Sequence, residues 1–149
     1  MDIKSAEDRS RNMSHIRSRD TSAEVYIRHL LYGKGYRYRI APKEIPGKPD
    51  LWFSGKKTAI FIHGCFWHRH AECKLAYMPK SRVEFWQKKF DANIARDQEV
   101  QQQLTERNNR CLIIWECTIR KMQKNPETEK QILDEIIRFL ENNTEFMEI

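Results

Sequence analysis

The sequence predicts an α/β domain in which helices flank a mixed β-sheet. Apolar residues recur at helical spacing in three segments, one near the start, one in the middle and one near the end of the chain. Short apolar runs rich in β-branched and aromatic residues lie between these segments, with glycine and proline turn signals beside them. A chain of 149 residues is long enough for one domain with its own core. The predicted order is α-β-β-β-α-β-α.

The first helix is predicted to begin at Thr21. Thr21 and Glu24 have the spacing of a capping box, in which each residue satisfies an amide of the other. Gly33 and Gly35 favour the end of the helix. Its apolar stripe consists of Ala23, Ile27, Leu30 and Leu31.

Three strands are expected after this helix. The run YRYRI (36–40) forms the first, and PKEIPGKP (42–49) is typical of a turn-rich connection. The segments DLWF (50–53) and TAIFIHGCFW (58–67), separated by SGKK (54–57), predict a hairpin.

The second half of the chain alternates between helical and strand patterns. Pro79 marks a boundary, and a long polar helix is expected from about Arg82 to Arg107. The run RCLIIWEC (110–117) is short and almost wholly apolar, which predicts a buried strand, and the last helix follows Pro126. The polar helix carries apolar residues at roughly helical spacing, namely Val83, Trp86, Phe90, Ile94 and Leu104. The inner face of the last helix is predicted to be Leu133, Ile136, Ile137 and Leu140.

The charge balance favours an anionic partner. The net charge is +6 and the isoelectric point is about 9.2, and nucleic acid is the commonest partner of such proteins. Residues 9–20 (RSRNMSHIRSRD) carry four arginines and one histidine, so we interpret residues 1–20 as a basic, exposed arm on a single domain spanning 1–149. No apolar run approaches the length of about 18 residues that a membrane span needs, and the N-terminus lacks the apolar core of a signal peptide. We therefore expect a cytoplasmic protein with reduced cysteines.

A structural zinc site is predicted around the segment HGCFWHRHAEC (63–73). Cys65, His70 and Cys73 have the spacing C-x4-H-x2-C, and a structural zinc needs four such ligands. Cys111 and Cys117 lie six residues apart on one predicted strand, about 20 Å, and so cannot share an ion. Cys111 lies inside the apolar run, whereas Cys117 ends it within reach of a loop, so we assign the fourth position to Cys117.

Two histidines and an aspartate are left for catalysis. His63 and His68 flank GCFW, and Asp50 opens a strand directly after the PGKP turn. A carboxylate on one strand of a hairpin and histidines at the end of the next can face each other across the pairing. Carboxylate, imidazole and a divalent cation suit phosphodiester hydrolysis.

Several segments together resemble the very short patch repair endonucleases of bacteria. They are RSRNMSHIRSRDTSAE, PGKPDLWF, IFIHGCFWHRHAEC, EFWQKKFDANIARD and LIIWEC, in this order from about Arg9 to Cys117. The resemblance implies an endonuclease that nicks double-stranded DNA on the 5′ side of the T in T·G mismatches, which arise when 5-methylcytosine deaminates. It also implies a restriction-endonuclease type of fold, with a central mixed sheet between helices.

The resemblance assigns roles to particular residues. Asp50 would bind Mg²⁺, with the backbone carbonyl of Ile62 as a second ligand. His68 would be catalytic, and the residues that support it by orienting water or protons would be His63, Glu24 and Asp97. The zinc ligands would be Cys65, His70, Cys73 and Cys117.

The resemblance also assigns DNA contacts. Phe66, Trp67 and Trp86 would enter the base stack, where inserted rings sense weak pairing because unstacking costs less at a mismatch. Trp86 also shares a helical face with Val83 and Phe90, so core packing is the alternative for it. The remaining contacts would be Met13 in the minor groove, Arg11 and Arg17 on phosphates, and Lys89 and Asn93.

Two departures and three alternatives remain open at the level of sequence. The acid and lysine of the wider nuclease superfamily are replaced by FIH (61–63), a change that the family shares, and position 69 is Arg. The alternatives are a restriction-type enzyme that cuts both strands of unmismatched DNA, a non-catalytic zinc-stabilised DNA-binding module, and a zinc hydrolase. The expected partner is double-stranded DNA with a T·G mismatch. Mismatch-repair proteins are further candidates, and the family suggests a monomer.

Overall fold

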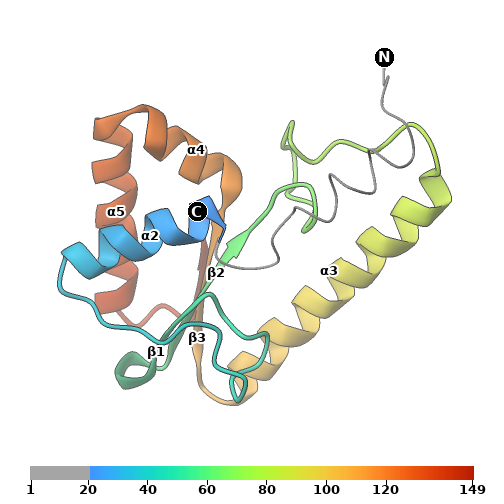
Figure 1. Ribbon diagram of the computed structural model, residues 1–149. Helices are drawn as coiled ribbons and strands as arrows, with labels where there is room; N and C mark the ends of the chain where they lie inside the picture. The colour runs from blue at the N-terminus through green and yellow to red at the C-terminus, as the bar shows by residue number, and fades with distance from the viewer. Residues whose placement is uncertain (1–20) are drawn as a thin grey trace.

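The computed structural model describes residues 21–149 and contains a mixed four-stranded sheet in the order β1-β2-β3-β4. The candidate DNA contacts Arg11, Met13 and Arg17 lie outside the described residues. Along the chain the elements are α2 (Ser22–Gly33), β1 (Leu51–Phe53), the short 3-10 helix η1 (Ser54–Lys56), β2 (Thr58–His63), α3 (Val83–Glu106), β3 (Arg110–Trp115), α4 (Glu116–Lys124), α5 (Pro126–Glu141) and β4 (Phe146–Glu148) (Figure 1).

The strand directions bring distant segments to one edge of the sheet. The predicted hairpin is confirmed, because β1 and β2 pair antiparallel with Leu51 opposite Ile60. Strand β3 then pairs parallel with β2, with Trp115 opposite His63, and β4 pairs parallel with β3. Because parallel strands end at the same edge, the segments after β2 and β3 start side by side.

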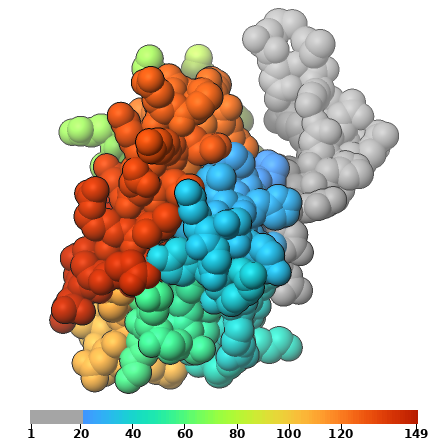
Figure 2. All heavy atoms as spheres, turned by 90° about the vertical axis from the view of Figure 1, so that its left-hand side faces the viewer, coloured from blue at the N-terminus to red at the C-terminus, as the bar shows by residue number. Residues whose placement is uncertain are grey.

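Helices cover both faces of this sheet, as the α/β prediction requires (Figure 1). On one face, α2, α4 and α5 enclose a core that includes Ile27, Leu112 and Ile136, each fully buried. On the other face, Leu104 of α3 packs against a second cluster that includes Ile113. Figure 2 shows α2 and α5 next to each other on the outer surface, where the Tyr26 hydroxyl donates to Glu129.

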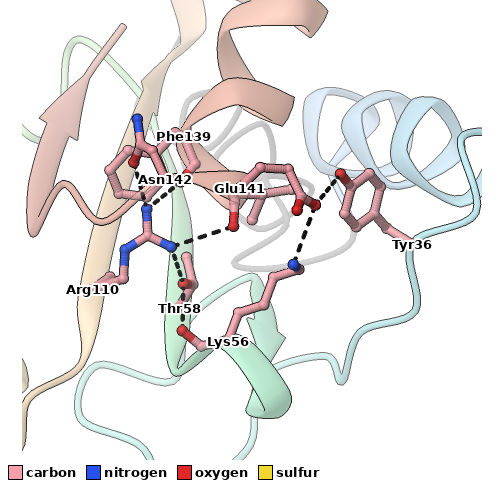
Figure 3. A network of polar contacts seen from close by, with 8 residues as sticks. Tyr36, Lys56, Thr58, Arg110, Phe139, Glu141 and Asn142 are labelled. Carbon is pink, nitrogen blue, oxygen red and sulfur yellow. Dashed lines mark hydrogen bonds and ion pairs between the residues drawn. The ribbon is translucent and has the colours of Figure 1, made fainter.

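A polar network fixes the end of α5 and the start of β4 to the opposite edge of the sheet (Figure 3). The Arg110 guanidinium donates to Thr58 Oγ1 (3.0 Å), to Asn142 Oδ1 (3.0 Å) and to the carbonyl of Thr144 (2.9 Å). Nearby, the Tyr36 hydroxyl donates to Glu141 Oε1 over 2.6 Å. These contacts lie at the edge of the sheet remote from the ends of β2 and β3.

One strand prediction is wrong, and another strand is shorter than predicted. Residues 36–40 form no strand, and only Arg39 pairs with Trp52, through two backbone hydrogen bonds of 2.9 Å. Gly35 and Ala41 have φ angles of +93° and +47°, which end extended backbone on both sides. The second hairpin strand ends at His63 rather than at position 67, because the chain then turns and the His68 amide donates to the Gly64 carbonyl over 3.1 Å.

Two elements in the C-terminal half were missed. The first is helix α4, which begins directly after β3 ends at Trp115. Cys117, predicted at the end of the strand, lies in the first turn of this helix. Strand β4 has only three residues and only Met147 among them is even half-buried, so it carries no apolar pattern that sequence reasoning could detect.

Candidate functional site

A cavity of about 580 Å³ opens beside the end of β2 and brings together all five candidate catalytic side chains. They come from α2, from the residue before β1, from β2, from the turn after β2 and from α3. The five are Glu24, Asp50, His63, His68 and Asp97.

Asp50 lies half-buried at the start of the hairpin, where Oδ2 accepts a hydrogen bond of 2.6 Å from the Ile62 amide. Desolvation raises the pKa of this carboxyl to about 7, and the nearby charge of Glu24 acts in the same direction, while the Ile62 amide opposes both. A strand residue directs its N–H and C=O to the same side. The Ile62 carbonyl therefore points toward the Asp50 side of β2.

His68 forms a pair with Asp97 of α3. The His68 Nδ1 and Asp97 Oδ2 atoms are 2.7 Å apart. A carboxylate at Nδ1 favours the tautomer that carries a proton there and leaves Nε2 as an acceptor. The arrangement orients the His68 ring and suits it to proton transfer.

His63 stacks on His68 and is held neutral. The ring centroids are 3.8 Å apart and the planes differ by 6°. Burial and, after it, the neighbouring charge of His68 together lower the pKa of His63 to about 3, against the opposing charge of Asp97. Within residues 21–149 its buried Nδ1 atom has no hydrogen-bond partner.

The stacked histidines and Asp97 also lie close enough to be considered as a metal site, since their ligand atoms lie within 4.8 Å of one another. The lone pairs of imidazole nitrogens lie in the ring plane. Two parallel rings 3.8 Å apart cannot both aim such a lone pair at one ion at about 2.0–2.1 Å. The geometry of His63 and His68 therefore favours proton transfer over joint metal binding.

Glu24 reaches the cavity from α2. The Thr21 half of the capping box is confirmed, because Thr21 Oγ1 accepts from the Glu24 amide over 3.3 Å. The residue Glu24 is 4% exposed, and its carboxylate forms an ion pair of 3.2 Å with Arg28 one helical turn later. Glu24 therefore has two roles. Its amide takes part in the helix cap, and its carboxylate places a buried charge at the cavity.

The four predicted zinc ligands form a second cluster. The Sγ and Nδ1 atoms of Cys65, His70, Cys73 and Cys117 lie within 4.8 Å of one another. Nδ1 of His70 is 3.6 Å from Cys65 Sγ and 3.4 Å from Cys117 Sγ. A tetrahedral zinc ion spaces sulfur and nitrogen ligands about 3.6 Å apart, so the donor set and its spacing fit zinc.

The parallel register explains how Cys117 joins the other three ligands. His63 and Trp115 are opposite each other, so the residues two positions further along, Cys65 and Cys117, are brought together. The Cys117 amide donates to Cys65 Sγ over 3.4 Å, and the Trp115 ring stacks on His70 at 4.1 Å. The predicted buried cysteine, Cys111, lies in the core, 3% exposed.

The candidate DNA-binding aromatics form one cluster against the N-terminal half of α3. Phe66 lies 5.0 Å from Trp67 and 5.5 Å from Trp86, measured between ring centroids. All three rings are half-buried. Trp86 also stacks on Phe90 at 5.7 Å, so it packs with neighbours while keeping part of its ring exposed.

Lys89 and Asn93 lie on α3 beside these rings. Lys89 Nζ is 5.7 Å from the centroid of the Trp67 ring. The Asn93 amide donates to the Trp67 carbonyl over 3.0 Å and also lines the cavity. Asn93 therefore connects the aromatic cluster to the catalytic cavity.

Sequence reasoning missed three basic residues of the cavity. Lys43, Lys48 and Arg96 line it together with Asp50. The one sequence feature that could have indicated them is the PGKP turn. In the structure Gly47 and Lys48 of this turn both have positive φ angles, 78° and 48°. This turn places a lysine two residues before the candidate Mg²⁺ ligand.

We expect Gly47→Ala to destabilise the protein by about 1–3 kcal/mol, through overpacking and positive-φ strain. A Cβ atom at position 47 would lie 2.6 Å from Val100 Cγ1 and 3.0 Å from Phe61 Cε1. Urea denaturation measures the change. Gly55→Ala is the control, because a Cβ there meets nothing within 4 Å, and equal stabilities for the two variants would contradict the prediction.

Within residues 21–149, no helix combines the length and apolar character needed to cross a membrane.

Comparisons of the sequence with known proteins find one family model and several similar chains. The family model described as "DNA mismatch endonuclease Vsr" matches residues 1–75. The DNA mismatch endonuclease Vsr of Escherichia coli strain K12 is 40% identical over 123 residues, 83% of this chain and 78% of that protein. The Type II nicking enzyme V.XorIIP of Xanthomonas oryzae pv. oryzae is 38% identical over 122 residues, 82% of this chain and 89% of that protein. The Type II nicking enzyme V.NmeAIP of Neisseria meningitidis serogroup A is 36% identical over 137 residues, 92% of this chain and 94% of that protein.

Proposed function

Since the chain belongs to the Vsr family of DNA mismatch endonucleases, we propose that it nicks double-stranded DNA on the 5′ side of the T in T·G mismatches. Such mismatches arise when 5-methylcytosine deaminates, and the nick would start very short patch repair in the bacterial cytoplasm. The observation that carries the proposal is the cavity shared by Asp50, His63, His68 and Asp97, from which Asn93 leads to the aromatic cluster.

We propose that the whole chain, 1–149, forms one endonuclease domain of the restriction-endonuclease type. The mixed sheet with helices on both faces supports this assignment. Residues 1–20 would form the DNA-contacting arm, with Met13 in the minor groove and Arg11 and Arg17 on phosphates.

Asp50 and the Ile62 carbonyl would hold Mg²⁺. Both are oxygen donors of the kind that hard cations prefer, and the raised pKa of Asp50 reflects a buried charge that a cation would stabilise. When bound, Mg²⁺ would stabilise negative charge on the phosphate during hydrolysis. The basic side chains of Lys43, Lys48 and Arg96 line the same cavity and would attract the DNA backbone.

His68 would move the proton. Asp97 holds its Nδ1 atom, so Nε2 is available to accept a proton from the attacking water or, once protonated, to donate one to the leaving oxygen. His63, neutral because of its lowered pKa, fixes the His68 ring by stacking and can orient water. Glu24 would support the same site from α2.

Cys65, His70, Cys73 and Cys117 would bind a structural zinc ion. Four protein ligands close the tetrahedron, which suits a structural role rather than the open site of a zinc hydrolase. The loop between the ligands Cys65 and His70 carries Phe66, Trp67 and His68. A bound zinc ion would therefore position the two inserted rings and the catalytic histidine together. Lys89 and Asn93 would contact DNA beside these rings.

A second candidate function is nicking at a specific sequence in fully paired DNA. The observation behind it is that V.XorIIP and V.NmeAIP are named Type II nicking enzymes. The aromatic cluster supports mismatch recognition more strongly, because inserted rings discriminate by the cost of unstacking.

A single assay separates the two candidates. Labelled duplexes with a central T·G mismatch, and their T·A twins, are incubated with protein and Mg²⁺ across candidate methylation contexts, with EDTA as a control. We expect one Mg²⁺-dependent nick 5′ of the mismatched T and at least about tenfold slower cutting of the twin, the effect of about 1.4 kcal/mol of unstacking cost. Equal cutting of both duplexes would favour the second candidate, and binding without cutting would favour a DNA-binding module.

A further inference from the structure

Tyr77 extends the aromatic cluster to the protein surface. Its side chain is 63% exposed, the highest value among the large hydrophobic side chains in the described part of the chain. Its ring nevertheless contacts the cluster, because the centroids of Tyr77 and Phe66 are 5.0 Å apart with planes inclined by 37°. Part of this ring is thus packed against the cluster, and the rest of it is accessible for stacking on a ligand.

Arg69 holds the backbone that carries this ring. Its guanidinium donates to the carbonyls of Phe66 (3.1 Å), Ala76 (2.9 Å) and Tyr77 (3.1 Å). The same guanidinium lies 3.9 Å over the ring of Phe90 on α3. One side chain therefore joins the zinc loop and the Tyr77 segment to α3, and a fixed backbone lowers the entropy that the exposed ring loses on binding.

The surroundings of the rings are basic. Residues 74–90 contain five lysines and arginines and a single acidic residue, Glu84. The Arg82 guanidinium lies 4.4 Å from the centroid of the Phe85 ring. Aromatic rings interleaved with cations form the kind of surface on which bases stack while phosphates meet positive charge. Charge complementarity therefore favours DNA over a second protein as the occupant.

We propose that Tyr77 stacks on a nucleobase of the bound DNA, next to the bases contacted by Phe66, Trp67 and Trp86, and that Arg69 is the positioning residue for this contact. The proposal rests on the proposed function. It adds a fourth ring to the three that the family resemblance assigns, and it gives Arg69, a departure in the zinc loop, a physical role.

Replacing the ring tests the contact. Tyr77→Leu and Tyr77→Phe are compared for binding to a fluorescein-labelled T·G duplex, with Ca²⁺ in place of Mg²⁺ to prevent cutting. We expect Tyr77→Leu to raise Kd about tenfold, which is about 1.4 kcal/mol, and Tyr77→Phe to stay within about twofold because it keeps the ring. Tyr32→Leu is the matched control, since Tyr32 on α2 is also exposed, 55%, and should leave Kd unchanged.

The positioning role of Arg69 has its own readout. Arg69→Met should weaken binding of the T·G duplex while retaining zinc. The double variant Arg69→Met/Tyr77→Leu should then bind no more than about twofold more weakly than Arg69→Met, because the same contact is already lost. If the Kd increases of the two single variants multiply in the double variant, this role is overturned, because the free-energy effects of independent sites add.

The outcomes separate this inference from the proposed function. Wild-type protein that neither binds nor nicks the T·G duplex would overturn both. Wild-type protein that nicks it, with Tyr77→Leu binding as tightly as wild type while Phe66→Leu weakens binding, would overturn the role of Tyr77 alone. Equal weakening by Tyr77→Phe and Tyr77→Leu would assign the contact to the phenol hydroxyl and overturn stacking.

Discussion

Asp50→Asn is expected to reduce the single-turnover nicking rate at least about 10³-fold, while DNA affinity stays within about threefold. A metal ion supplies several kcal/mol of charge stabilisation to the transition state, and about 4 kcal/mol corresponds to this factor at 1.36 kcal/mol per tenfold. Asparagine keeps an oxygen that accepts from the Ile62 amide, so the hairpin should keep its geometry. The measurement compares nicking of a labelled T·G duplex in Mg²⁺ with binding of the same duplex in Ca²⁺.

Asp91→Asn is the matched control. Asp91 is an exposed aspartate on α3 whose Oδ1 accepts a hydrogen bond of 2.9 Å from Gln87, so its replacement should leave nicking unchanged. Thermal unfolding of both variants checks that the comparison is between folded proteins. Activity within a few-fold of wild type in Asp50→Asn would place the catalytic centre elsewhere.

The elements that the sequence predicts well are those whose stability comes from local patterns. Helix α2 begins at its predicted cap, since Thr21 accepts from the Glu24 amide, and α5 begins with Pro126 behind the cap residue Asn125. Strand β4 depends instead on backbone pairing with β3, as in the bond of 2.9 Å from the Ile149 amide to the Ile113 carbonyl. Nothing in the three residues Phe146–Glu148 signals that partner.

The site divides in the same way. The spacing of Cys65, His70 and Cys73 is local and can be recognised in the sequence. Cys117 is 52 residues from Cys65 and is brought next to it only by the parallel pairing of β2 with β3. The sequence predicts Cys117 at the end of a strand as the fourth ligand, and the structure brings Cys117 next to the other three side chains from the first turn of a helix. The role of Arg69 could not be predicted, because its three carbonyl acceptors lie together only in the folded loop.

The second large effect is expected from Cys73→Ser, which should lose bound zinc and at least about 3 kcal/mol of stability. A structural zinc ion contributes its binding free energy directly to folding. For a chain of this length 3 kcal/mol lowers the melting temperature by about 6–12 °C. Zinc content per protein and thermal unfolding are measured on the same samples.

Cys111→Ala separates loss of zinc from loss of a cysteine. Cys111 is buried in the core and belongs to neither metal-capable group, so its replacement should cost about 1 kcal/mol of packing and retain one zinc. Because the loop between Cys65 and His70 carries Phe66, Trp67 and His68, Cys73→Ser should also lose mismatch nicking, whereas Cys111→Ala should keep it. A zinc-free Cys73→Ser protein with wild-type stability and activity would show that packing around Trp115 and α4 alone holds this loop in place.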